Sequence, residues 1–375
     1  MNLRKLTHSL CGLVCLIWAR RHVEKKSCDI LFLHLWDGEI QRVSNLSKSL
    51  CKTGLLVKHV VMDGFYKVLL KRLLYSFKST ENWEEWYPDL YVSYLIEKYN
   101  PKIVVTLDSG KYAKYLKQHM ELSGGYTLNL AHGVLVNSPL FVNYLYHYYF
   151  IFGQSSLDAA KMQINRMGNP KISLTGSYLI DRDFILPPNI HGKKVVFFST
   201  WLPAEHKELL LRNYSIIAQW AQNQSKFQLV IKHHPRENPE IIRQIFNGID
   251  NVEFASHDTD MKEILEDAVM AIVCWSCASF EAAMLNRPVI VVNDSDEMTD
   301  IIELEKYFLP RARTSSELQQ RIEQTMDNYD DMLIRAKGFV KRHMEYTTDS
   351  IDVITNRICS IYNDKDDFDY IKLND

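Results

Sequence analysis

The stretch "LVIKHHPREN", residues 229–238, runs from apolar residues into a basic cluster with two imidazoles. Its apolar part is typical of the end of a buried strand. Lys232, His233, His234 and Arg236 therefore follow the point where that strand leaves its sheet. Open α/β sheets bind ligands at such carboxyl ends. Taken alone, the cluster is more often a solvated turn, so its meaning depends on the rest of the chain.

Short apolar runs alternate with helical stretches on both sides of this segment. Strands are predicted within residues 29–35, 55–62, 101–109, 126–134, 147–155, 171–178, 194–200, 227–234, 251–256, 268–275 and 287–294. Such alternation is typical of parallel sheets with crossover helices. The periodicity stops near residues 183–194, where two prolines, a glycine and polar residues indicate a linker.

This pattern predicts an α/β protein of two doubly wound, Rossmann-like domains that face a cleft. The expected N-terminal domain spans residues 29–185, and the expected C-terminal domain spans residues 194–375 and ends in a helical tail. The length of 375 residues exceeds one ordinary core and agrees with two domains.

The composition is that of a soluble globular protein, with 46% hydrophobic residues, 24% charged residues and a net charge of −2. It argues against a disordered chain and against a general nucleic-acid binder, which would be clearly basic. Seven cysteines are not spaced as a disulfide framework, which favours a reducing, cytoplasmic compartment.

Cys274 and Cys277 form a C-x-x-C motif within "VCWSCASFEA". This spacing is found in zinc sites, where it supplies two of the ligands, and in redox-active cysteine pairs. No second C-x-x-C completes a four-thiolate site, so we expect the two cysteines to be small packing residues at a strand-to-helix turn.

The first 28 residues hold the apolar run "LCGLVCLIWA", residues 10–19, between basic flanks. This run is about half the length that spans a bilayer. A signal peptide and a packed helix are alternatives, but arginines directly follow the run and no clear cleavage site is present. We favour an anchor in the membrane interface, which predicts peripheral contact with the inner face of the cytoplasmic membrane.

Polar residues follow other predicted strands of the second domain as well. Thr200 follows one strand, and "CWSCASFEA" carries Ser276, Ser279 and Glu281 where another strand passes into a helix. Backbone N–H groups and hydroxyls at a helix start suit a phosphate. The alternative for the two serines is an ordinary helix cap.

Together these segments resemble a known group. "LVIKHHPRE … DAVMAIVCWSCASFEAAMLNRPVIVVN", "LNLAHGVLVNSP" and "YYFIFGQSSLDAAKM … KISLTGSYLIDR" resemble GT-B-fold transferases of bacterial surface polymers. The likeness is to the CDP-glycerol glycerophosphotransferases and their capsule-polysaccharide and polysialyltransferase relatives, over roughly residues 126–295. The chain has Cys274-Trp275-Ser276-Cys277 where the first group has Asp-Tyr-Ser-Ser, and Ala131 where it has Trp. These departures leave the transferred group open.

The resemblance implies a donor site in the second domain. Its residues would be Thr200, Lys232, His234, Pro235, Arg236, Ser276, Ser279 and Glu281. His234 would hydrogen-bond the donor phosphate and stabilise the leaving nucleotide, while Lys232 and Arg236 add positive charge. Pro235 would fix the chain direction after His234. Many enzymes of this group use neither a metal nor a cofactor, and we expect neither here.

For the general base the resemblance implies His132, on the acceptor side of the cleft. An imidazole suits this role because its ordinary pKa lies near neutrality. Asp37 in "LWDGEIQR" is the rival, since it follows the first strand and lies beside Gly38 and Glu39. A turn with a helix cap is the alternative for that segment, and we favour His132.

The predicted function is a glycosyltransferase that moves a sugar or polyol phosphate from a nucleotide-activated donor to a glycan or lipid-linked acceptor. Capsule, O-antigen of lipopolysaccharide and teichoic-acid-like polymers are all candidate products. A nucleotide-sugar 2-epimerase of the same fold and a non-catalytic binding protein remain alternatives. The apolar, basic N-terminal segment favours a lipid-linked acceptor and therefore the transferase.

Overall fold

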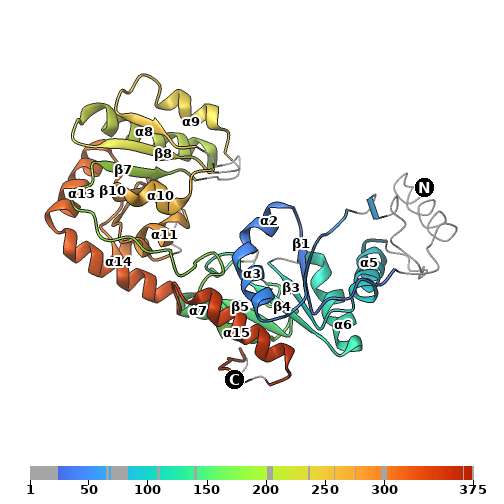
Figure 1. The fold of residues 1–375 in the computed structure, drawn as a ribbon. Coiled ribbons are helices and arrows are strands. Elements are labelled where there is room, and N and C mark those ends of the chain that lie inside the picture. Colours follow the sequence, from blue (N-terminus) through green and yellow to red (C-terminus); the bar gives the residue numbers. More distant parts are fainter. Residues whose placement is uncertain are drawn as a thin grey trace, which may run out of the picture. The chain divides into compact units, whose positions relative to one another are not determined.

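The computed structural model divides the chain into two compact units. Unit 1 comprises Met1–Asp181 and Glu345–Asp375, and unit 2 comprises Arg182–Met344. The structure describes residues 24–64, 67–68, 83–107, 110–138, 142–200, 206–234, 237–256, 258–274, 276–296, 302–365 and 367–373. Each unit has its own parallel sheet with helices packed against it (Figure 1).

The sheet of unit 1 has six parallel strands in the order β2-β1-β3-β4-β5-β6. The strands are β1 (Ile30–His34), β2 (Val57–Val61), β3 (Ile103–Thr106), β4 (Tyr126–Leu130), β5 (Tyr148–Ile151) and β6 (Lys171–Leu174). The helices are α2 (Gly38–Arg42), α3 (Ser44–Lys52), α5 (Trp83–Tyr99), η1 (Gly110–Tyr112, a 3₁₀ turn), α6 (Ala113–Ser123), α7 (Gln154–Met162) and α15 (Ser350–Tyr362).

Strand β1 shows why this sheet needs helices on both faces. All five of its residues are buried. Leu31 and Leu33 pack into a cluster that includes residues of α5 and α6, while Ile30 and Phe32 pack into another that includes residues of α3 and α15. Successive side chains of a strand point to opposite faces. The continuous apolar run of β1 therefore corresponds to a doubly covered strand.

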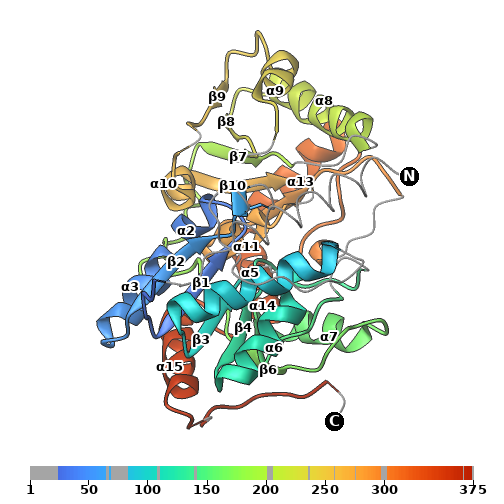
Figure 2. The ribbon, with the colours of Figure 1, turned by 90° about the vertical axis from the view of Figure 1, so that its right-hand side faces the viewer.

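The sheet of unit 2 has five parallel strands in the order β11-β10-β7-β8-β9. Figure 2 labels β10, β7, β8 and β9 of this sheet. The strands are β7 (Lys194–Phe198), β8 (Gln228–Lys232), β9 (Val252–Phe254), β10 (Ala268–Val273) and β11 (Val289–Val291). The helices are α8 (Lys207–Asn223), α9 (Pro239–Ile245), α10 (Met261–Glu266), α11 (Ala278–Met284), α12 (Leu304–Tyr307), α13 (Ser315–Asp327) and α14 (Tyr329–His343).

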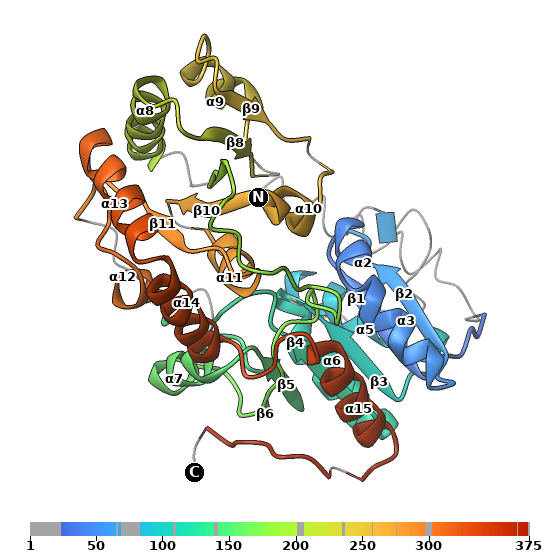
Figure 3. The same cartoon turned by 60° about the vertical axis from the view of Figure 1, so that its left-hand side comes forward.

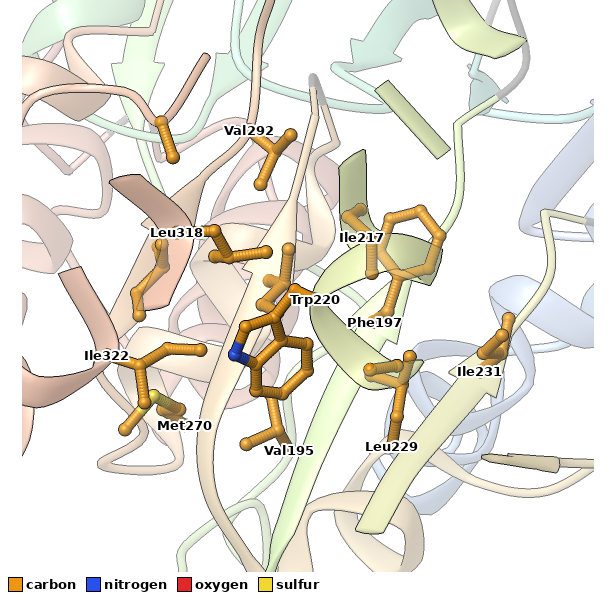
Figure 4. Close-up of a cluster of buried hydrophobic side chains, with 14 of the residues drawn as sticks. Val195, Phe197, Ile217, Trp220, Leu229, Ile231, Met270, Val292, Leu318 and Ile322 are labelled. Carbon is orange, nitrogen blue, oxygen red and sulfur yellow. The ribbon is translucent and has the colours of Figure 1, made fainter. Parts of the chain in front are cut away.

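One face of this second sheet carries the main core of unit 2. Trp220 of α8 is buried among Val195 and Phe197 of β7 and Leu318 of α13 (Figure 4). Its indole Nε1 donates to Oε1 of Gln319 at 2.8 Å, so the buried polar atom has a partner. On the other face, α11 packs along α14 (Figure 3). The sheet is thus covered on both faces.

Arg287, which precedes β11, is fully buried in unit 2. Its guanidinium donates to backbone carbonyls of Leu265 at 2.8 Å, Glu266 at 3.0 Å, Leu285 at 2.9 Å and Pro187 at 2.7 Å. A buried charge is costly unless it is fully hydrogen-bonded. The arginine of the "RPVI" segment therefore holds the start of unit 2 onto the end of α10.

The predicted GT-B class of two doubly wound α/β units is confirmed, and every predicted strand segment contains an observed strand. Between β1 and β2 the chain forms α2 and α3, with a break at Val43. Gly54 then has a φ of +91°, a conformation that favours glycine.

The carboxyl-terminal tail differs from its prediction, which placed all of residues 194–375 in one domain. Helix α15 instead packs against α3 of unit 1 (Figure 1). Ile354 and Ile358 enter the core beneath β1, and Thr355 donates to Ser49 Oγ at 2.9 Å. The apolar spacing of a terminal helix reveals that it needs a partner but does not identify the partner.

The predicted interfacial anchor at the N-terminus falls largely outside the described residues, which begin at residue 24. Within the part of the chain that is described, no helix combines the length and the apolar character needed to span a membrane. The anchor stays a prediction.

Candidate functional site

Three neighbouring strands of unit 2 end at the same level. Phe198 of β7 pairs with Lys232 of β8 on one side and with Val273 of β10 on the other. The chain passes from β7 to β8 and β9 and then returns to the far side of β7 as β10. The boundary between β7 and β10 is a topological switch point, where sheets of this type bind their ligands. The predicted donor residues thus follow aligned strand ends.

The backbone around His234 is fixed by the neighbouring strand end. The N–H of His234 donates to Ser199 Oγ at 2.8 Å, and the N–H of Glu237 donates to the carbonyl of His234 at 2.9 Å. The N–H of Ser199 in turn donates to the carbonyl of Lys232 at 3.0 Å. His234 is half-buried. Pro235 and Arg236, also predicted donor residues, lie outside the described residues.

A half-buried carboxylate lies behind this turn. Glu237 accepts a hydrogen bond from the Ser199 hydroxyl through Oε2 and one from Tyr214 of α8 through Oε1 at 2.7 Å. Burial raises the pKa of Glu237 above its usual range. The Tyr214 hydroxyl also contacts the backbone of Thr200, with N–H at 3.1 Å and carbonyl at 3.0 Å. The predicted donor residue Thr200 is buried and belongs to this network.

Lys232 is oriented toward the loop after β9. Its Nζ donates to the carbonyls of Ser256 at 2.8 Å and Thr259 at 3.0 Å. Burial lowers the pKa of Lys232. The ammonium is therefore held in a defined position at this edge of the sheet, to which it contributes positive charge.

Ser276 and Ser279 are engaged with each other at the start of α11. Ser276 Oγ accepts from the N–H of Ala278 at 3.2 Å, and the Ser279 hydroxyl donates to the carbonyl of Ser276 at 2.8 Å. Ser279 is fully buried, Ser276 is half-buried, and Glu281 is half-buried in the first helical turn. These local hydrogen bonds at the helix start agree with a capping role for the two serines. Their binding of a phosphate stays a prediction.

The C-x-x-C motif does not form a disulfide. Cys274 is buried, Cys277 is exposed, and neither is part of a disulfide. Burial raises the pKa of Cys274, which disfavours the reactive thiolate. Both findings favour the packing role over redox chemistry. Across the residues that the structure describes, no cluster of three or more His, Cys, Asp or Glu side chains could hold a metal ion.

In unit 1, the rival base Asp37 is exposed just before α2. Its neighbour Glu39 is buried and accepts the N–H of Leu35 at 2.9 Å, so the two acidic residues point to different environments. A Cβ at Gly38 would lie 1.6 Å from the exposed Trp36 ring, so a larger residue there would require this ring to move.

A pair of histidines, which no local pattern predicts, lies close to Glu39. His34 at the end of β1 is fully buried, and its Nε2 is 2.9 Å from His59 Nδ1 on β2. His59 Nε2 is 2.9 Å from Ser47 Oγ on α3. His34 Nδ1 lies 3.6 Å from the carboxylate of Glu39. Burial and the neighbouring His34 lower the pKa of His59 to about 4.

The predicted base His132 is exposed in the turn after β4. The backbone is fixed on both sides, because Ala131 N–H donates to the carbonyl of Phe150 at 2.9 Å and Leu135 N–H donates to Ser156 Oγ at 3.0 Å. A Cβ at Gly133 would meet no atom within 4 Å. The turn therefore presents His132 beside open space. Asp108 and Ser109, which the sequence also places after a strand, lie outside the described residues.

Ser199 and Glu237 stand out in the sequence only as polar residues at strand ends, and no role for them is predicted. Both lie in segments that attract attention, one directly after β7 and the other three residues after His234. Their joint role depends on a contact between residues 38 positions apart, which no local pattern reveals. A serine directly after a buried strand was the one available signal.

Two parallel-sheet units of this kind define the GT-B class. Residues 188–360 match the model of the CDP-Glycerol:Poly(glycerophosphate) glycerophosphotransferase family, and this match includes both "KHHPRE" and "SCASFEA". The resemblance inferred from these segments is therefore confirmed for the C-terminal half. No match was found among curated proteins.

Solved structures of the same fold cover nearly the whole chain. One match is a structure from Listeria monocytogenes, described as a putative UDP-N-acetylglucosamine 2-epimerase. It has a TM-score of 0.63 and 13% identity, over 92% of this chain and 100% of that one. MnaA from S. aureus with UDP matches with a TM-score of 0.61 and 14% identity, over 90% and 97%.

The wall teichoic acid polymerase TagF, soaked with CDPG, matches with a TM-score of 0.57 and 12% identity, over 97% of each chain. At these identities the likeness to solved structures establishes the fold alone. The family match of residues 188–360 favours a transferase over an epimerase.

Proposed function

We propose that the protein is a transferase of cell-surface polymer synthesis, which moves a glycerol phosphate or a sugar from a nucleotide-activated donor to a glycan or lipid-linked acceptor. The observation that carries this proposal is the glycerophosphotransferase match over residues 188–360, which contains the strand end with His234. A teichoic-acid-like polymer is the favoured product, with capsule and O-antigen polysaccharides as the alternatives.

On the donor side, His234 would donate a hydrogen bond to the phosphate that stays with the nucleotide. Lys232 and Arg236 would add positive charge, and Ser276 with the first N–H groups of α11 would contact the same phosphate. Glu281 would accept from the ribose. Charge that develops on the leaving phosphate would thus meet fixed donors, which need no reorganisation during the reaction.

On the acceptor side, His132 would take the proton of the attacking hydroxyl. The acceptor oxygen forms a bond to the transferred group, the bond from that group to the nucleotide phosphate breaks, and the nucleotide leaves with the bonding electrons. The exposed ring of His132 beside Gly133 supports this role. Asp37 is exposed after β1 and is the second candidate.

The donor class is tested by thermal shift of the full chain with CMP, CDP, UDP and GDP. A ligand that binds only the native state raises the melting temperature. We expect the largest shift with a cytidine or uridine nucleotide. The best binder then sets the base of the donor for transfer assays. No shift with any of the four nucleotides would contradict the proposed function.

The alternative activity, 2-epimerisation of a nucleotide sugar, is supported by the fold shared with 2-epimerase structures. An epimerase converts UDP-N-acetylglucosamine without an acceptor, whereas a transferase does not. Incubation of the protein with this compound alone, followed by chromatography, separates the two. Conversion would replace the transferase proposal. Nucleotide binding without transfer to any acceptor would instead support a binding protein.

We also propose that residues 1–28 bring the enzyme to the membrane surface, where a lipid-linked acceptor would lie. Sedimentation of the full chain with vesicles that contain anionic lipid tests this. A chain that begins at residue 24 should lose vesicle binding and keep its nucleotide binding. Equal binding by both chains would remove the anchor from the proposal.

A further inference from the structure

Each oxygen of the Glu237 carboxylate accepts a hydrogen bond from a side chain of another segment. Oε2 accepts from Ser199, which follows β7, and Oε1 accepts from Tyr214 of α8. Glu237 itself lies between β8 and α9. Glu237 is half-buried, and partial removal of a carboxylate from water is costly unless it is hydrogen-bonded. The arrangement therefore calls for a reason beyond packing.

Hydrogen-bond direction supplies that reason. An ionised carboxylate can only accept, so it fixes where the proton of each neighbouring hydroxyl goes. The single proton of Ser199 is directed to Glu237, which leaves a Ser199 lone pair for the N–H of His234 at 2.8 Å.

The same logic holds at Tyr214. Its single proton has two acceptors in reach, Glu237 Oε1 at 2.7 Å and the Thr200 carbonyl at 3.0 Å. The carboxylate is the stronger acceptor because it is charged. Tyr214 then accepts from the N–H of Thr200 at 3.1 Å. Because the Glu237 carboxylate accepts the hydrogen bonds that Ser199 and Tyr214 donate, both hydroxyl oxygens act as acceptors. They accept the backbone N–H groups that follow two neighbouring strands.

We propose that Glu237 is a positioning residue of the donor site, which holds His234 through Ser199 and Thr200 through Tyr214. This inference rests on the proposed function, because it assigns His234 and Thr200 to the nucleotide donor. Glu237 itself does not touch the donor. It fixes the backbone from which the donor-binding groups project.

The first test is amide hydrogen exchange of the free, full-length chain, followed by NMR with selective labelling of histidine and threonine. Ser199→Ala should speed exchange of the His234 amide only, and Tyr214→Phe that of the Thr200 amide only. Glu237→Gln should speed both, because an amide side chain can donate as well as accept and no longer fixes the hydroxyls. Each change should be about tenfold or more, as expected for the loss of one hydrogen bond of about 1.4 kcal/mol.

A merely structural role would give another pattern. Uniform acceleration of all amides in each variant would reflect global destabilisation and would overturn the proposal. Ser199→Thr keeps the hydroxyl and should restore slow exchange at His234. Glu240→Gln is the matched control, since Glu240 is an exposed carboxylate on α9 that pairs with Arg243. If Glu237→Gln fails to fold, the Ser199 and Tyr214 variants still decide the matter.

The second test is calorimetric titration with CDP, UDP and GDP. If the wild type binds one of them, Glu237→Gln and Ser199→Ala should weaken that binding about tenfold, while Ser199→Thr and Glu240→Gln bind as the wild type does. Binding lost in His234→Ala but unchanged in Glu237→Gln and Ser199→Ala would overturn this inference and leave the proposed function intact. A wild type that binds none of these three nucleotides, and no CMP in the thermal-shift assay, would contradict both this inference and the proposed function.

Discussion

Arg287 gives the clearest single-residue prediction of stability. Replacing it with Met leaves several backbone carbonyls of unit 2 without their donor, so we expect the free energy of unfolding to fall by about 3 kcal/mol. Urea denaturation measures this change. Arg335→Met is the control, because Arg335 is about half exposed and pairs with Asp331 on its own helix. Equal losses in the two variants would contradict the structural role of Arg287.

The general base is a second question at the scale of residues. We expect His132→Ala to lower kcat at least about 100-fold, because a positioned base contributes that much, while nucleotide affinity stays unchanged. Asp37→Asn should lower kcat less than about tenfold. Release of the nucleotide from the donor, in the presence of acceptor, is the measurement. The opposite ranking would assign the base to Asp37.

Where a local signal exists, the sequence predicts the position of a residue, while its role stays a prediction. His234 was singled out because an imidazole directly follows an apolar run, and the structure places it at an aligned strand end. The role of Glu237 could not be predicted, because its partners, Ser199 and Tyr214, come from other segments of the chain. Such contacts depend on strand order, which the sequence does not state.

At the scale of elements, the histidine pair between β1 and β2 predicts a pH dependence of stability. His59 has a pKa of about 4 in the folded chain and an ordinary value of 6.5. Unfolding therefore takes up a proton between these values, so stability is full above pH 6.5 and falls as the pH drops toward 4. We expect His59→Gln to lose less stability over this range than the wild type.

Melting temperatures between pH 7 and pH 4 check this expectation. His191→Gln is the control, since His191 is exposed in the linker before β7. The wild type and the His191 variant should follow one curve. If the His59 variant follows that curve as well, the pair of His34 and His59 does not contribute to the loss of stability at acid pH.

Strands were easier to predict than the docking of helices. β1 and β10 are continuous apolar runs, which is what a strand buried on both faces requires. Helix α15 shows an amphipathic pattern of the same quality, yet it packs on α3 of unit 1 rather than with the helices that precede it. The apolar periodicity of a helix predicts which face is buried but does not predict which element that face packs against.

At the scale of the whole molecule, the GT-B fold leaves the activity open. Structures of 2-epimerases and of a teichoic acid polymerase share it at 12–14% identity. One fold commonly hosts several chemistries, so function must be decided at the site. Here the family match over residues 188–360 and the strand end with His234 point to the transferase.

The most direct test of the account is nucleotide release by the His234→Ala variant, with His233→Ala as the adjacent control. The assay supplies the donor whose nucleotide binds best, such as CDP-glycerol, together with a glycan acceptor. We predict that His234→Ala loses at least about 100-fold in turnover, as expected when a donor to the developing charge is removed, and keeps its melting temperature within a few degrees. His233→Ala should retain near-normal turnover. Full activity of a folded His234→Ala variant would contradict the account.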